Sequence, residues 1–275
     1  MYPYDIIPNT GINLYVICLG LAAVAAILAF SKLADVVGIS AKVQNMSLYT
    51  AILAIVFGYG SAVLFQSFYN MLADGTFTID KNTGATFYGG LIGGVVSFIV
   101  IYFIWGNFKF DDDTHKREFI HVLNVAPASI TIAHGIGRIG CLMGGCCYGP
   151  KTDAWCGITM KNLGYKVIPT QLFEAIFLFL LFSLTVYLIY KKKPYNMPLY
   201  MIGYGIWRFI LEYVRADDRG QTVIASLTPS QLVAIIMIVS GAVLFAFLKK
   251  LNKNADLSVD TDEGEEEAEK ESEDV

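Results

Sequence analysis

The chain has 275 residues, of which 55% are hydrophobic and 16% are charged, and its formal net charge is −4. The apolar residues fall in long blocks separated by short charged loops, which is the pattern of a membrane protein with several spans. Residues 251–275 hold eleven acids and two lysines, so the remainder of the chain is basic. A basic body suits contact with anionic membrane lipids. Proteins that bind nucleic acid carry a soluble basic face with interleaved aromatic residues. This sequence shows no such face, so we do not expect nucleic acid as a partner.

Residues 12–30 form the first apolar block, which is long enough to cross the hydrocarbon core of a bilayer. No basic residue precedes this block, whereas a signal peptide begins with positive charge, so we interpret it as a retained span. Six further spans are predicted at residues 48–71, 87–105, 119–140, 171–190, 198–213 and 231–248. The sequence therefore predicts an all-α, polytopic membrane protein with about seven transmembrane helices.

The lysines and arginines of the loops predict the orientation of these spans. The loops after spans 1, 3 and 5 and the start of the tail after span 7 hold eleven of them, and the N-terminus with the loops after spans 2, 4 and 6 holds six. Because the richer side normally faces the cytoplasm, we expect the N-terminus outside and the C-terminus inside. Residues 1–250 then form one transmembrane domain. The acidic residues 251–275 lack apolar periodicity and predict a disordered cytoplasmic tail.

Arg138 lies in the glycine-rich end of the fourth span, and Glu174 lies about one turn into the fifth. An arginine at membrane depth is costly and normally faces a bundle interior or a wet cavity, where it marks a functional site. Arg208, Glu212 and Arg215 follow an i, i+4, i+7 spacing near the end of the sixth span, which predicts that they share one helix face. In the predicted orientation all five side chains lie toward the outer half of the bilayer.

Guanidinium groups grip phosphate through a rigid two-pronged fork and stay charged. Arg138 and Arg208, oriented by Glu212 or Glu174, are therefore predicted to bind a phospholipid headgroup and to stabilise a phosphate leaving group. Simpler interpretations remain open for four of the five polar residues. Arg208 and Glu212 can form an intrahelical pair, Arg215 can extend to the membrane interface, and Glu174 can favour a helix N-terminus.

Four of the five cysteines fall within sixteen residues: Cys141, Cys146, Cys147 and Cys156. One interpretation pairs Cys146 or Cys147 with Cys156 in a disulfide on an oxidising outer face, and another makes them small packing residues. Arg138 can lower the pKa of Cys141 and favour a nucleophilic thiolate. A zinc site is not expected, because paired CxxC units are absent.

Five segments together resemble the prolipoprotein diacylglyceryl transferase family, and the resemblance covers most of residues 10–250. The segments are residues 58–69, 88–93, 137–149, 169–174 and 208–215. The resemblance implies a multi-pass enzyme of the bacterial plasma membrane that works as a monomer without metal or organic cofactor, with its site open to the outer half of the bilayer. Such enzymes move the diacylglyceryl group of phosphatidylglycerol onto the lipobox cysteine thiol in a prolipoprotein signal peptide, and glycerol phosphate leaves.

The resemblance also implies roles for particular residues. The essential arginines of the family fall on Arg138 and Arg208, its signature glycine falls on Gly149, and its Gly-Gly-Leu-Ile-Gly stretch places Gly89 and Gly90 at the lipid site. We expect these residues, with Glu212, Arg215 and Glu174, to bind lipid.

This chain also departs from the family pattern. Tyr88 stands where the family has a histidine, and Cys141 stands where it usually has an asparagine; both are candidate catalytic residues. Gly144 and Cys146 replace a later asparagine and acid, and the arginine of the second span is absent near Tyr59. Tyrosine is a poor base near neutral pH because its pKa is about 10. Two alternatives to diacylglyceryl transfer onto a prolipoprotein therefore stay open. The chain can be a divergent family member that acts on another acceptor through its own cysteines, or a non-catalytic protein that binds anionic lipid.

Overall fold

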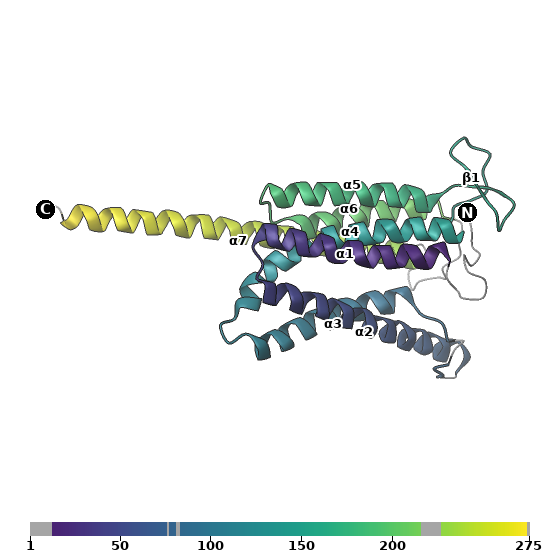
Figure 1. Ribbon diagram of the computed structural model, residues 1–275, viewed down its shortest axis with the longest axis horizontal. Coiled ribbons are helices and arrows are strands. Elements are labelled where there is room, and N and C mark those ends of the chain that lie inside the picture. The colour runs from purple at the N-terminus through teal and green to yellow at the C-terminus, as the bar shows by residue number, and fades with distance from the viewer. Residues whose placement is uncertain (1–12, 76, 81–82, 216–226, 274–275) are drawn as a thin grey trace. The chain divides into compact units, whose positions relative to one another are not determined.

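A computed structural model describes residues 13–75, 77–80, 83–215 and 227–273. Within these ranges the chain forms seven helices and one two-stranded sheet (Figure 1). The helices are α1 (Leu14–Val37), α2 (Ala41–Asp74), α3 (Phe87–Lys109), α4 (Thr114–Gly144), α5 (Thr170–Tyr190), α6 (Asn196–Glu212) and α7 (Pro229–Glu273). The strands are β1 (Ile158–Met160) and β2 (Tyr165–Val167). The predicted all-helical polytopic class is confirmed, and the short sheet is an element that apolar patterning did not predict.

Six of the helices in the described ranges are long and apolar enough to cross a membrane. The exception is α6, whose 17 residues extend about 25 Å at 1.5 Å per residue, less than the roughly 30 Å of a hydrocarbon core. Large apolar side chains such as Leu21, Ile55 and Leu180 are exposed on the helices. Exposed apolar surface of this kind is expected where helices contact lipid instead of water.

The chain forms two compact units, one of residues Ser31–Leu123 and the other of Met1–Phe30 with Asn124–Val275. In the first unit α2 packs along α3. Gly58 permits their close approach, because a Cβ at this position would lie 3.0 Å from the carbonyl oxygen of Gly90. Ser40 caps α2, and the carboxylate of Glu118 accepts hydrogen bonds from both the backbone and the hydroxyl of Ser40 at 2.9 Å. This cap explains why α2 begins seven residues before the apolar block that predicted it.

Glycines also set the helix spacing in the second unit, where α5 and α6 run side by side (Figure 1). A Cβ on Gly135 of α4 would lie 2.7 Å from the ring of Phe179 on α5, and one on Gly205 of α6 would lie 3.0 Å from the carbonyl oxygen of Ala234 on α7. Gly140 of α4 meets Cys18 of α1 in the same way, at 3.0 Å. Helices that meet at small residues in this manner bring their polar side chains within bonding distance.

The segment between α4 and α5 carries the antiparallel strands β1 and β2, in which Ile158 pairs with Val167 and Met160 with Tyr165. Met160 and Val167 are fully buried and pack with Leu142 from the last turns of α4. The hairpin is therefore anchored to the end of α4. This contact fixes the connection that leads from the cysteine-rich segment into α5.

The helix α7 continues through the acidic end of the chain to Glu273, although the sequence predicts a disordered tail there. The acidic residues follow an apolar segment in the same helix, and the side chains of residues 252–275 lie outside the described part of the structure. The division into a domain of residues 1–250 and a tail of residues 251–275 therefore stays a prediction.

Candidate functional site

Arg138 and Glu174 form an ion pair between α4 and α5. The Nε atom of Arg138 lies 2.9 Å from Oε2 of Glu174, and the side chains are 15% and 0% exposed. Glu174 belongs to the second turn of α5, which begins at Thr170. A fully buried carboxylate requires a charged partner or several hydrogen bonds. The pair therefore accounts for the burial of both charges and places Glu174 against Arg138, while the lipid-binding role of both residues stays a prediction.

Two more side chains converge on the same carboxylate. The hydroxyl of Tyr204 on α6 donates a hydrogen bond of 2.8 Å to Oε1 of Glu174. The Nε2 atom of His134, one turn before Arg138 on α4, lies 3.7 Å from the same oxygen. The rings of His134 and Tyr204 meet edge to face, with centroids 5.2 Å apart. Glu174 thus joins α4, α5 and α6 at one buried point.

Arg208 forms a second polar group one turn after Tyr204 on α6. Its Nη2 atom lies 2.7 Å from Oε2 of Glu212 and donates a hydrogen bond of 2.7 Å to the hydroxyl of Ser230 at the start of α7. Thr228 donates a hydrogen bond of 2.9 Å to the other oxygen of Glu212. The side chains of Arg208 and Glu212 are 9% and 5% exposed. The predicted intrahelical pair is therefore present and is extended to α7.

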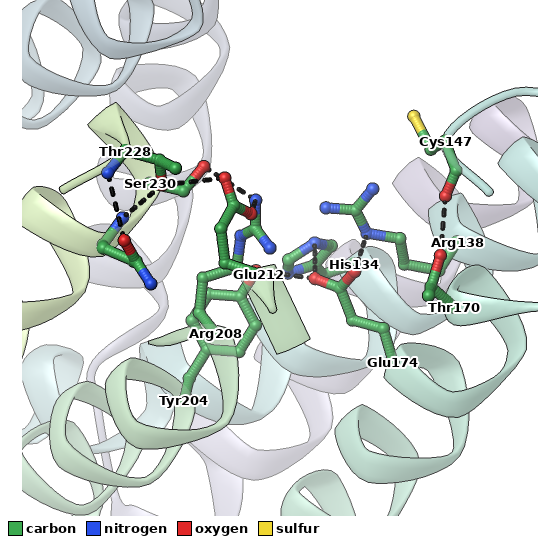
Figure 2. A network of polar contacts seen from close by, with 11 residues as sticks. His134, Arg138, Cys147, Thr170, Glu174, Tyr204, Arg208, Glu212, Thr228 and Ser230 are labelled. Carbon is green, nitrogen blue, oxygen red and sulfur yellow. Dashed lines mark hydrogen bonds and ion pairs between the residues drawn. The ribbon is translucent and has the colours of Figure 1, made fainter. Parts of the chain in front are cut away.

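The two groups form one site, because Tyr204 contacts Glu174 and shares α6 with Arg208. In Figure 2 the guanidinium of Arg138 projects past Glu174 toward Arg208 and Glu212. His134 lies within electrostatic reach of Arg138, Glu174 and Arg208. The Nη1 atom of Arg208 is buried, and no described residue accepts a hydrogen bond from it. A buried guanidinium donor of this kind is suited to binding a phosphate or carboxylate oxygen.

Three thiols lie at the end of α4. The Sγ atoms of Cys141, Cys146 and Cys147 are all within 4.8 Å of one another. Cys141 belongs to the last turn of the helix, and the other two follow its end at Gly144. All five cysteines of the chain lie in the described ranges and are free, so the structure does not contain the disulfide with Cys156 that one interpretation predicted.

Backbone contacts hold the turn that carries Cys146 and Cys147. The hydroxyl of Thr170 donates a hydrogen bond of 2.8 Å to the carbonyl oxygen of Cys147, and the side-chain amide of Gln171 donates one to that of Cys146. Cys147 has a left-handed backbone with a φ of 63°, which is uncommon for a residue other than glycine and persists where the surroundings impose it. The start of α5 therefore fixes the backbone of the turn that carries Cys146 and Cys147.

The sequence predicted that Arg208, Glu212 and Arg215 share one helix face, and this prediction is wrong for Arg215. The helix α6 ends at Glu212, so Arg215 lies beyond it and does not continue the face. Arg215 instead interacts with Cys147. Interactions with the Cys141 and Cys146 thiols and with Arg215 lower the pKa of Cys147, and the same coupling between the thiols raises the pKa of Cys146. Arg215 therefore belongs with the thiols.

Gly149 faces protein atoms. A Cβ at this position would lie 2.7 Å from the carbonyl oxygen of Val214 and 3.0 Å from Cβ of Ile168, and the amide of Gly149 donates a hydrogen bond of 2.9 Å to the carbonyl oxygen of Ile168. The glycine therefore allows the end of the cysteine segment to contact the segment after α6. Close backbone packing explains this glycine without a lipid contact.

The remaining predicted residues belong to the other compact unit. Gly89 and Gly90 lie on α3 and face α2, where an added Cβ would lie 2.6 Å from Phe65 and 3.3 Å from Ala62 respectively. Helix packing thus explains both glycines, and their predicted role in lipid binding stays a prediction. The side chain of Tyr88 lies outside the described residues, so its predicted catalytic role also stays a prediction.

Four polar residues of the site were not predicted: His134, Tyr204, Thr228 and Ser230. His134 and Tyr204 each precede one of the two arginines by four residues, so they share a helix face with Arg138 and Arg208. This spacing was a usable signal. Ser230 gave none, because its contact with Arg208 depends on how α7 packs on α6.

The comparisons with known proteins agree with this architecture. The family model described as prolipoprotein diacylglyceryl transferase matches residues 4–247. A phosphatidylglycerol–prolipoprotein diacylglyceryl transferase 2 of Clostridium perfringens (strain 13 / Type A) is 29% identical over 245 residues, which cover 84% of this chain and 89% of that protein. A phosphatidylglycerol–prolipoprotein diacylglyceryl transferase of Finegoldia magna is 32% identical over 221 residues, which cover 76% of this chain and 83% of that protein. The chain therefore belongs to the prolipoprotein diacylglyceryl transferase family.

Proposed function

We propose that this protein transfers the diacylglyceryl group of phosphatidylglycerol to the cysteine thiol of a prolipoprotein, at the outer leaflet of a bacterial plasma membrane. The observation that supports this function best is the pair of buried arginine–glutamate contacts, Arg138–Glu174 and Arg208–Glu212, on helices that the hydrogen bond from Tyr204 of α6 to Glu174 of α5 holds together. Membership of the family and the matching names of its relatives support the choice of substrates.

The arginines bind the lipid phosphate in this proposal. Their net charge with Glu174 and Glu212 is zero, so the network is stable in apolar surroundings before lipid enters. The buried Nη1 of Arg208 supplies a donor to a phosphate oxygen. The carboxylates hold the guanidinium groups in one orientation and thereby reduce the ordering cost when lipid binds.

The reaction exchanges one bond for another. The acceptor sulfur, as thiolate, attacks the glyceryl carbon that bears the phosphate, so that a C–S bond forms and the C–O bond breaks. The electron pair remains on the oxygen of the leaving glycerol phosphate, and the thiol proton passes to water. Negative charge on the phosphate increases during this step, and Arg138 and Arg208 are placed to stabilise it.

The same chemistry argues against a covalent intermediate on Cys141. Covalent catalysis helps when the intermediate breaks more easily than the substrate. A diacylglyceryl group on Cys141 would be held by a thioether, which has a poorer leaving group than a phosphate ester. We therefore assign the transfer to a single displacement by the acceptor thiol.

The test uses phosphatidylglycerol that is labelled in its diacylglyceryl group and measures which product carries the label. Purified protein is incubated with this lipid and a peptide that carries a lipobox cysteine, and a peptide with serine in its place is the control. The expected product is a labelled thioether on the cysteine peptide only, with release of unlabelled glycerol phosphate. Tight lipid binding without transfer would support a non-catalytic lipid-binding protein instead, and transfer to another acceptor would support the divergent relative.

A further inference from the structure

The thiols of Cys141, Cys146 and Cys147 have the arrangement of a metal-ligand set. Their Sγ atoms lie within 4.8 Å of one another. Thiolates bound to one tetrahedral Zn²⁺ at about 2.3 Å lie about 3.8 Å apart, so small side-chain rotations bring the three sulfurs to one ion. The spacing along the chain did not predict this set, because the turn after α4 brings the last two cysteines back toward the first.

The fold holds the turn that carries two of these thiols. Contacts of backbone carbonyl oxygens with Thr170, Gln171 and Asn162 fix residues 145–147, including the left-handed Cys147. Cys146 is exposed, whereas Cys141 and Cys147 are partly buried. A ligand can therefore reach the set from outside the helix bundle.

We propose that Cys141, Cys146 and Cys147 bind one Zn²⁺ as thiolates, and that its fourth coordination position takes the acceptor thiol. The second part rests on the function proposed above. Three protein ligands with an open fourth position is the arrangement of catalytic zinc. In the ranges that the structure describes, no fourth histidine, cysteine, aspartate or glutamate joins the set.

The charges around the set favour this arrangement. Three thiolates and Zn²⁺ carry one net negative charge, which requires cationic neighbours in apolar surroundings. Arg215 hydrogen-bonds Cys147, and Arg138 lies within electrostatic reach of Cys141 and Cys147. Because Arg138 also belongs to the phosphate site, an acceptor sulfur on the metal would lie beside the lipid that it attacks.

The metal would supply a route from the acceptor thiol to its thiolate. A thiol that coordinates zinc loses its proton near neutral pH. With Cys141, Cys146 and Cys147 holding the ion, the acceptor thiol would lose its proton to solvent on binding, and its sulfur would then form the bond to the glyceryl carbon while glycerol phosphate leaves with the electron pair of the broken C–O bond. Such activation needs no general base, which suits a chain with Tyr88 where its family has a histidine.

The metal site is tested first without any lipid. The purified full-length protein is reduced, titrated with Co²⁺, and monitored by the near-ultraviolet thiolate-to-cobalt band, whose intensity follows the number of Co–S bonds. We expect one Co²⁺ per chain, and a loss of about a third of the band with weaker binding in each of Cys141→Ser, Cys146→Ser and Cys147→Ser. Cys18→Ser and Cys156→Ser, which alter cysteines outside the set, are matched controls that should keep the wild-type band.

The fourth position is tested by adding the lipobox peptide to the Co²⁺ protein. The cysteine peptide should increase the thiolate band, and its serine analogue should not. Absence of Co²⁺ uptake, an unchanged band in the three variants, or a disulfide within the set in protein taken directly from cells would overturn the metal site. Full transferase turnover after metal removal, checked by elemental analysis, would overturn its role with the acceptor. A normal Co²⁺ band in a protein without any transferase activity would instead refute the proposed function and leave the metal site standing.

Discussion

The Nε atom of Arg138 lies 2.9 Å from a carboxylate oxygen of Glu174 that is completely buried. This pair joins two helices that are separated in the chain by the cysteine segment and the β-hairpin. It holds the guanidinium of Arg138 inside the helix bundle with its charge paired, as Glu212 pairs the charge of Arg208. The predictions below follow from this pair and from the close packing around it.

Replacement of Arg138 with lysine should reduce transfer strongly while leaving the membrane protein folded. Lysine keeps the charge but loses the planar fork that can bind phosphate and Glu174 together. We expect a loss of transferase activity of at least about tenfold, as for removal of one transition-state donor. The measurement is label transfer to the lipobox peptide. The matched control is Arg117→Lys, which changes an exposed arginine of the other unit. Wild-type turnover by Arg138→Lys would show that transfer does not need the planar guanidinium group.

Replacement of Glu174 with glutamine should destabilise the protein. The change leaves Arg138 as an uncompensated buried charge, which costs about 3–5 kcal/mol. Thermal unfolding in detergent measures the effect. In the double variant with Arg138→Met no buried charge remains unpaired, so we expect part of the stability to return. Purely additive losses in the two single variants and the double variant would argue against a coupled pair.

Gly149→Ala should disturb the site, whereas Gly20→Ala should not. The alanine Cβ at residue 149 would lie 2.7 Å from the carbonyl oxygen of Val214, while nothing lies within 4 Å of one at Gly20. The first change forces two backbone segments apart, and the second improves helix propensity by up to about 1 kcal/mol. Stability and lipid transfer are measured for both variants. An equally stable Gly149→Ala protein would mean that the contact relaxes without cost.

The predicted orientation can be tested by labelling single cysteines in a cysteine-free variant. Trp155 is 96% exposed in the segment that precedes β1, and Lys191 follows α5 at the opposite end of that helix. With the N-terminus outside, a membrane-impermeant maleimide applied to intact cells should label Trp155→Cys and leave Lys191→Cys unlabelled until the cells are opened. The reverse pattern would place the arginine site toward the cytoplasm.

The sequence by itself determined the helical membrane class, because spans of about twenty apolar residues have few other stable forms in a bilayer. It also identified Arg138, Arg208, Glu174 and Glu212, since charges inside such spans are rare and require a partner. Even the pairing of Arg208 with Glu212 could be predicted, because an i, i+4 spacing places two side chains on one helix face.

Only the tertiary structure decided which helices share Glu174 and where the sixth helix ends. The ending of α6 at Glu212 directs Arg215 to Cys147, and local periodicity cannot show that ending. The three thiols likewise come together through a left-handed residue and through carbonyl contacts from α5. These are contacts between segments distant in the chain, so their geometry depends on how the helices pack and not on the spacing of residues within any one of them.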